Sequence, residues 1–155
     1  MTEIALAYLH YLALIGTVSL LVAQHLLVGC TISGAALQRA QMIDAAYGAL
    51  AGTTLATGLM RVFWGAKGSA YYFSNTVFHT KVSIFLLVAL LSILPTVCFI
   101  RWSRAARRDT AFVPPAAELS QVRMLIRVQL LMLTTLPLLA AAMARGVTRF
   151  GQFFG

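Results

Sequence analysis

Acidic residues are scarce in this chain. Only four of its 155 residues are acidic, and charged residues of both signs make up 10% of the total. An ordinary soluble domain has about 25% charged residues. Hydrophobic residues make up 60%, and they gather in runs long enough to cross a bilayer, for which about 20 residues suffice. The shortage of charge therefore excludes an ordinary soluble domain and predicts an integral membrane protein in contact with the lipid bilayer.

Cysteine is scarce as well. Cys30 and Cys98 are the two cysteines, and no Cys-x-x-Cys or similar metal-binding spacing occurs, which argues against a structural zinc site. The net charge of +8 at first suggests nucleic acid as a partner. The bases lie between apolar runs rather than on a soluble face, however, so attraction to an anionic membrane surface explains them better than nucleic-acid binding does.

Four apolar runs predict the fold class, an all-α integral membrane protein built as a four-transmembrane-helix bundle in a single domain, 1–155. The spans cover about residues 4–30, 45–64, 77–100 and 124–144. Helices are expected because backbone polar groups in lipid must find their partners within the segment. Residues 65–75 read as a turn rich in glycine and aromatic residues.

The distribution of bases predicts an orientation. Four spans place both termini on the same side of the membrane, and the link 31–44 and the loop 101–123 on the other. More bases lie on the side of the link and the loop than on the side of the termini. By the positive-inside rule, we expect a cytoplasmic loop 101–123 and periplasmic termini in a bacterial inner membrane.

Polar residues recur at seven-residue spacing, which returns to the same helix face. The first span carries His10, Thr17 and Gln24 in this way, and the second carries Tyr47, Thr54 and Arg61. A polar stripe on an apolar span is expected to face protein rather than lipid.

Three spans bring a base or an imidazole to a similar depth below the surface at the termini. At about 1.5 Å per residue, His10 lies about 9 Å deep, Arg61 about 5 Å and Lys81 about 6 Å. No carboxylate shares this level except Glu3 at its edge. Unpaired positive charge at such depth needs an anion or a route to water. Two interpretations stand: Arg61 and Lys81 extend to lipid phosphates, or an anionic or metal-containing ligand lies between the first three spans.

His79 and Lys81 open the third span together. They are two residues apart, hence about 200° apart around a helix, so they cannot both face one ligand directly. One should point into the bundle, and the other toward lipid, a neighbouring subunit or the interface.

One long stretch resembles a known family. Residues 58–102, GLMRVFWGAKGSAYYFSNTVFHTKVSIFLLVALLSILPTVCFIRW, are similar to the core of domain of unknown function 2214, a bacterial family of small membrane proteins with four spans. AYLHYLA (7–13) and PLLAAAMARG (137–146) resemble the ends of that family. The resemblance covers nearly the whole chain and implies a fold, but no activity.

A histidine early in the first span and a His-x-Lys motif opening the third resemble a more remote group. It comprises the haem-containing membrane protoporphyrinogen oxidases and the membrane domains of copper-resistance proteins. In those oxidases the matching histidine and lysine are thought to serve a b-type haem. The resemblance therefore implies cofactor-binding roles for His10 and Lys81, with His79 nearby. In the closer family an aromatic residue commonly stands at the position of His79, which favours Lys81 as the residue to test.

Two functions follow from these observations. The first is a redox protein that binds haem b or a porphyrin; if it is an enzyme, it is an oxidoreductase of the protoporphyrinogen-oxidase type. His10 would ligate the haem iron, Lys81 would be a second ligand or a propionate partner, and Arg61 would pair with a propionate. The alternative is a non-enzymatic subunit or an assembly or stabilising factor of a larger membrane complex, with homo-oligomers also open. Transport ranks third, because no Asp or Glu lies within the predicted spans.

Overall fold

The computed structural model describes residues 2–29, 32–64 and 68–148, and all regular structure in these ranges is helical. The helices are α1 (Thr2–Leu27), α2 (Ala35–Trp64), α3 (Gly68–Phe73), α4 (Thr76–Arg108) and α5 (Ala116–Ala144). Four are long, and the short α3 lies in the segment that the sequence predicted to be a turn. The prediction of an all-helical chain is confirmed for the described residues.

Three of the long helices continue beyond the apolar runs that predicted them, whereas α1 ends at Leu27, before the predicted end near 30. α2 begins at Ala35 rather than near 45, α4 ends at Arg108 rather than near 100, and α5 begins at Ala116 rather than near 124. The predicted link 31–44 and loop 101–123 are therefore mostly helix. Hydropathy marks the apolar part of a helix, whereas the helix itself continues until its backbone hydrogen bonds are interrupted. Pro115 is the residue that precedes the first turn of α5, where its missing N–H costs nothing.

Three described helices are long and apolar enough to cross a membrane, over Glu3–Leu27, Thr76–Arg108 and Ala116–Ala144. α2 contains the predicted span 45–64 but is not among them. Its sequence mixes apolar residues with several glycines, threonines and polar side chains. A fourth crossing, and with it the placement of both termini on one side, therefore stays a prediction.

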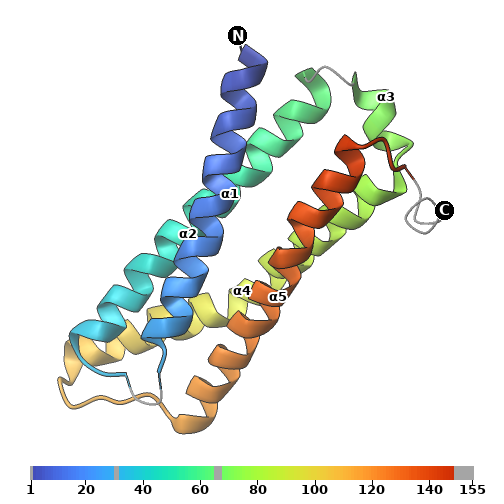
Figure 1. Ribbon diagram of the computed structural model, residues 1–155. Helices are drawn as coiled ribbons and strands as arrows, with labels where there is room; N and C mark the ends of the chain where they lie inside the picture. Colours follow the sequence, from blue (N-terminus) through green and yellow to red (C-terminus); the bar gives the residue numbers. More distant parts are fainter. Residues whose placement is uncertain (1, 30–31, 65–67, 149–155) are drawn as a thin grey trace.

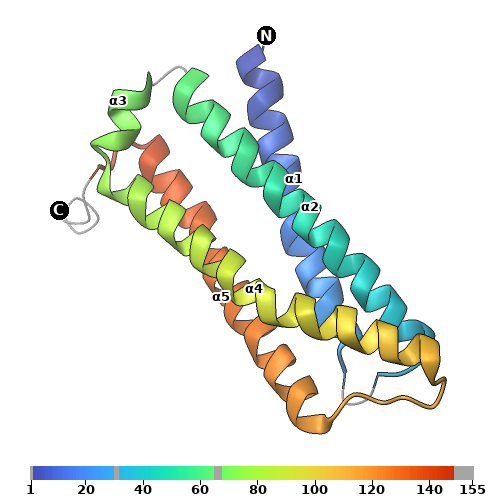
Figure 2. The same cartoon turned by 180° about the vertical axis from the view of Figure 1, so that it is seen from behind.

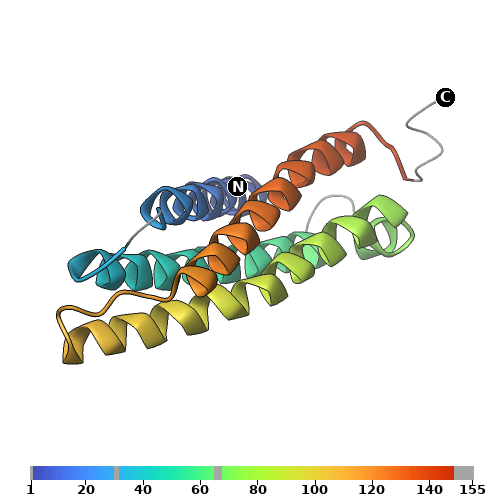
Figure 3. The same cartoon turned by 90° about the horizontal axis from the view of Figure 1, so that it is seen from below.

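The long helices form two pairs, α1 with α2 and α4 with α5, and the two helices of each pair pack along one another. The C-terminal part of α4 approaches the N-terminal part of α2, and from there the pairs diverge toward α3 (Figures 1 and 2). Seen along a perpendicular direction, α5 crosses over α4 at an angle rather than running parallel to it (Figure 3). We call the end near α3 the α3 end and the opposite end the loop end.

The main core occupies the loop end and the middle of the molecule. Its largest fully buried side chains include Trp102, Phe99, Leu21, Leu37 and Ile126. There the indole N–H of Trp102 donates a hydrogen bond of 2.9 Å to a carboxylate oxygen of Glu118. The same oxygen also pairs with Arg101, so this carboxylate joins α4 to α5.

Hydrogen bonds also close the α3 end. The Tyr71 hydroxyl of α3 donates to the Met143 carbonyl of α5 at 3.1 Å. The side chain of Asn75 caps α4 by accepting from the Phe78 N–H at 3.1 Å, and the Thr76 N–H donates to the Thr148 carbonyl at 3.1 Å. α3 and the start of α4 are thereby held against the end of α5.

Candidate functional site: a cavity lined by cations

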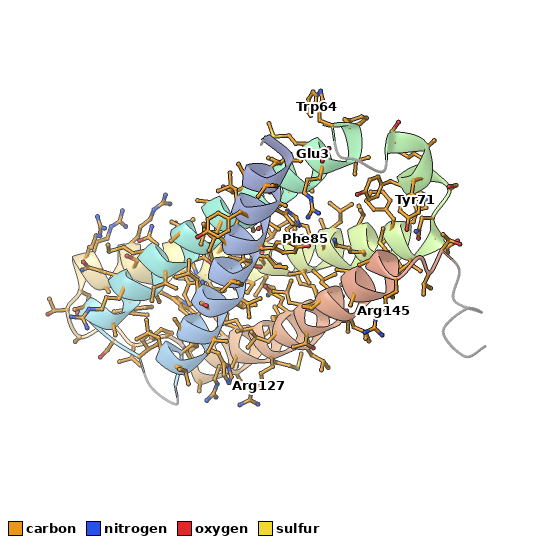
Figure 4. The ribbon with its side chains drawn as sticks, turned by 45° about the horizontal axis from the view of Figure 1, so that its top comes forward. Glu3, Trp64, Tyr71, Phe85, Arg127 and Arg145 are labelled. Carbon is orange, nitrogen blue, oxygen red and sulfur yellow. The ribbon has the colours of Figure 1, made fainter. Side chains whose placement is uncertain are left out.

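A cavity of about 220 Å³ lies between the two helix pairs toward the α3 end. All five helices contribute to its wall. Most of the wall is apolar or aromatic, and its members include Leu14, Leu55, Tyr71, Tyr72, Phe78, Val82, Phe85, Leu136 and Met143. Figure 4 shows Tyr71 on the inner side of α3, whereas Trp64, Arg127 and Arg145 point away from the molecule.

The polar stripe of α1 faces the interior, as expected. His10, Thr17 and Gln24 are all buried, with at most 6% of each side chain exposed. On α2, Tyr47 and Thr54 of the second stripe are buried as well. One residue of the α1 stripe, His10, lines the cavity. Two residues of the α2 stripe, Thr54 and Arg61, line it as well.

His10 is held against α2. Its Nδ1 lies 3.0 Å from the hydroxyl oxygen of Thr57, a hydrogen-bond distance. The next residue, Gly58, leaves room for the ring: a Cβ atom at this position would lie 3.2 Å from His10 Cε1. The Nδ1–Cε1 edge of the imidazole is therefore packed on α2, and Nε2 is the ring nitrogen that remains for a ligand.

Arg61 and Lys81 supply positive charge to the cavity wall. The guanidinium carbon of Arg61 lies 5.3 Å from the centroid of the Tyr11 ring, a cation–π distance. In the described ranges the ion pair that forms is Arg101–Glu118, at the loop end, and no Asp or Glu is among the described residues of the wall. Both cations thus line a cavity whose described wall holds no counter-charge.

His79 lies elsewhere. Its side chain is exposed, and its Nε2 lies 2.9 Å from the Phe73 carbonyl, to which an N–H there would donate. It is not among the described residues that line the cavity. The structure therefore brings together His10, Arg61 and Lys81 from three helices and leaves His79 outside, in line with the helical geometry of the His-x-Lys motif. A cofactor role for His79 stays a prediction.

The sequence analysis missed a buried carboxyl group at the other end of the polar interior. Asp44 is 5% exposed and accepts a hydrogen bond of 2.8 Å from the side-chain amide of Gln24. One turn further along α2, the Tyr47 hydroxyl donates to the Gln129 side-chain oxygen of α5 at 3.2 Å. Asp44 is the last residue of the predicted link 31–44 and directly precedes the predicted span 45–64. The spacing of Asp44, Tyr47 and Thr54 on one helix face was the signal that could have revealed it.

The described residues form no site that could hold a free metal ion through several side chains. Within them, no group of three or more His, Cys, Asp or Glu side chains is suited to hold a metal ion. A haem takes at most two axial ligands from the protein. This finding therefore bears on free metal ions and not on a single imidazole that meets a haem.

Comparisons with known proteins identify the family but no activity. Residues 2–148 match the family model described as "Predicted membrane protein (DUF2214)". No curated protein and no solved structure matched the chain. The likeness to haem-containing oxidases therefore rests on the short motifs alone. Since the match extends over nearly the whole sequence, the chain belongs to the DUF2214 family of predicted membrane proteins.

Proposed function

We propose that this protein binds a tetrapyrrole of the haem b or porphyrin class between its two helix pairs and serves as a membrane redox protein. The observation that carries the proposal is the cavity into which α1, α2 and α4 bring His10, Arg61 and Lys81, with no acidic residue in its described wall. A tetrapyrrole has a flat apolar body and two carboxylates. The aromatic wall suits the body, and two cations suit the carboxylates.

The residues present fit a haem. His10 offers Nε2 to the iron, while its Nδ1 is held by Thr57, the arrangement usual for metal-binding histidines. Arg61 would pair with one propionate, and Lys81 would pair with the other or bind the iron as a second ligand. When bound, the haem would supply one-electron chemistry. The chain would bind and orient it and exclude water. An enzymatic role, as an oxidoreductase of the protoporphyrinogen-oxidase type, is part of this proposal.

The cavity sets a condition on binding. Its volume is about 220 Å³, whereas pockets for drug-sized ligands measure roughly 300–1,000 Å³. A tetrapyrrole needs more space than the cavity provides. We therefore expect the α1–α2 and α4–α5 pairs, which already diverge toward the α3 end (Figure 1), to move further apart on binding.

Visible spectra test this function. The protein is purified in mild detergent, supplied with haem, and recorded in the oxidised and the dithionite-reduced state. We expect a Soret band in the wild type and its loss in His10→Ala. His25→Ala and His79→Ala are matched controls that should retain the band, because neither side chain is among the described residues of the wall. A wild-type protein that takes up no haem would overturn the proposal.

The two roles open to Lys81 are separable in the same experiment. If Lys81 binds the iron, Lys81→Met changes the band positions and the spin state. If it pairs with a propionate, Lys81→Met weakens haem binding and leaves the band positions where they were. Arg61→Met should give the second pattern, because a guanidinium pairs with carboxylates.

The membrane arrangement belongs to the same proposal. We place the protein in a bacterial inner membrane with α2 as the fourth crossing, the predicted loop 101–123 in the cytoplasm and both termini in the periplasm. Single cysteines introduced at Ser120 and Thr148 test this arrangement, in a variant without Cys30 and Cys98. A membrane-impermeant thiol reagent applied to intact cells should label position 148 and spare position 120. Labelling of position 120 but not of position 148 would overturn the orientation. If both positions are labelled, or neither is, they do not lie on opposite sides of the membrane.

A role as a subunit of a larger complex is the second candidate, and one surface favours it. Gly48, Gly52 and Ala56 are exposed at four-residue spacing on α2, and neither glycine has another atom near its open side. Small residues at this spacing let a second helix approach closely in a membrane. Co-purification in mild detergent, compared between the wild type and Gly52→Leu, tests this role. Ala89→Leu at an exposed position of α4 is the control. A wild-type chain that purifies alone would count against the subunit.

A further inference from the structure

The hydroxyl group of Thr57 has its hydrogen committed to its own helix. The hydroxyl oxygen lies 2.7 Å from the Thr53 carbonyl oxygen and 3.2 Å from the Thr54 carbonyl oxygen. Carbonyl oxygens only accept hydrogen bonds, so both short contacts require that the hydroxyl hydrogen point toward these carbonyls. The Thr57 oxygen then has lone pairs, but no hydrogen, to offer to any further partner.

His10 is that further partner, at 3.0 Å through Nδ1. Since the Thr57 oxygen can only accept there, Nδ1 must carry the hydrogen and donate it. In a neutral imidazole one nitrogen donates and the other accepts. His10 is therefore held in the tautomer whose Nε2 is unprotonated.

The packing of Gly58 preserves this arrangement. His10 Cε1 would lie only 3.2 Å from a Cβ atom at position 58, so the ring sits closely on the helix. A half-turn of the ring would exchange Nδ1 for a carbon and leave Thr57 facing a C–H group. That would forfeit the hydrogen bond, which makes the observed orientation the favoured one.

An unprotonated Nε2 on a residue of the cavity wall discriminates between two forms of the same ligand. Metal-bearing and metal-free tetrapyrroles carry the same carboxylates, so Arg61, and Lys81 when it pairs with a propionate, cannot tell them apart. Only the metal-bearing form offers an acceptor orbital to Nε2. We propose that Thr57, by fixing the tautomer of His10, makes the cavity selective for a metal-bearing tetrapyrrole over its metal-free form. This inference rests on the function proposed above.

Titrations with three ligands test the selectivity: haem, zinc protoporphyrin and metal-free protoporphyrin, each added to the purified full chain in detergent. We expect the wild type to bind both metal-bearing forms at least about tenfold more tightly than the metal-free form, since second-shell partners of this kind change metal affinity by about 10–100-fold. Thr57→Val should lose most of that preference, and Thr57→Ser should keep it. Thr53→Val is the matched control, because the Thr53 hydroxyl bonds the Ala49 carbonyl.

The outcomes separate this inference from the function beneath it. Equal affinity of the wild type for all three ligands would overturn the selectivity but leave tetrapyrrole binding intact. Wild-type behaviour of Thr57→Val would overturn the role of Thr57. Failure to bind any of the three ligands would overturn the proposed function itself.

A direct measurement of the tautomer needs no variant at Thr57. In a His25→Gln, His79→Gln protein, His10 is the only histidine, so its two ¹⁵N resonances can be assigned. We expect a protonated Nδ1 and an unprotonated Nε2 in the ligand-free protein. The opposite pattern would contradict the inference even if Thr57→Val failed to fold. A readout from the loaded protein is the reduction potential of the haem, which should rise in Thr57→Val because the imidazole becomes a weaker electron donor.

Discussion

The two ends of this molecule differ in whether their charged side chains find a partner within the chain. Toward the loop end, the Asp44 carboxyl group accepts a hydrogen bond from Gln24, and the Tyr47 hydroxyl donates one to Gln129. Some buried polar atoms in this part still lack a partner among the described residues, the Gln129 amide nitrogen among them. Toward the α3 end, Arg61 and Lys81 line a cavity without a carboxylate in its described wall. The paired groups can be explained by the packing of the chain alone. The two cations have no acidic partner in the described wall, and the ligand proposed above rests on this difference.

We therefore expect substitutions of the hydrogen-bonded pairs at the loop end to lower stability, and substitutions in the cavity wall to lower ligand affinity. Removing one partner of a buried pair leaves the other unsatisfied, at a cost of about 1–3 kcal/mol. Arg61 and Lys81 are half-buried and have no acidic partner in the described wall, so removing either charge leaves no carboxylate unpaired.

Asp44→Ala should have the largest effect. It leaves the Gln24 amide buried without its acceptor and opens a small void, so we expect the free energy of unfolding to fall by about 2–3 kcal/mol. Unfolding in mixed micelles with increasing denaturing detergent measures this loss. Glu3→Ala, at an exposed carboxylate of α1, is the control and should change little. If Asp44→Ala and Glu3→Ala are equally stable, the Asp44–Gln24 hydrogen bond does not stabilise the protein, and this prediction is wrong.

Lys81→Met should show the opposite behaviour. A charge-assisted hydrogen bond is worth about 1.5–3 kcal/mol, so loss of the ammonium group should weaken haem binding at least about tenfold. Without ligand, we expect the variant to be as stable as the wild type or slightly more so, because no partner in the described wall is lost. Parallel haem titration and unfolding measure both properties. A large loss of stability with unchanged binding would show that Lys81 pairs with protein after all.

Gly58→Ala and Gly52→Ala form a matched pair on α2. Replacing a helical glycine by alanine should stabilise each helix by about 0.5–1 kcal/mol. At position 52 the new methyl group enters open space, but at position 58 it would lie 3.2 Å from His10 Cε1. We therefore expect Gly52→Ala to be more stable than the wild type, and Gly58→Ala to be less stable than Gly52→Ala and to bind haem less tightly than the wild type, by a fewfold. Equal haem affinities would show that the ring adjusts freely.

The sequence predicted the cavity cluster better than it predicted the helix ends. His10, Arg61 and Lys81 could be placed at one level because the rise of a helix is fixed and each residue lies a few residues inside one end of its apolar run. His79 could be separated from Lys81 for the same reason. The burial of His10 against Gly58 and the role of Thr57 depend on how α1 and α2 approach each other, which no single-helix pattern contains.

Hydropathy alone does not predict that Asp44 is buried inside α2. A carboxylate ends an apolar run, so the predicted span began after it, although the helix continues back to Ala35. Its partner Gln24 lies 20 residues earlier, on a different helix. The charge that looked like a boundary is an interior group, because another helix supplies its hydrogen bond. The prediction that no Asp or Glu lies within the spans holds for the span drawn from 45, but the helix itself includes the buried Asp44.

Tyr47→Phe should have the smallest effect and tests the hydrogen bond between Tyr47 and Gln129. Its hydroxyl donates to Gln129, but the amide nitrogen of Gln129 is buried without a hydrogen-bond partner among the described residues. A hydrogen bond between helices in a membrane averages about 0.6 kcal/mol, so we expect a loss of about that size. Gln129→Leu also removes the unsatisfied nitrogen, so the Tyr47→Phe, Gln129→Leu double variant should be at least as stable as Tyr47→Phe alone. If the double variant instead loses the sum of the two single losses, the two side chains act independently. The Tyr47–Gln129 hydrogen bond would then not be the interaction that stabilises the loop end.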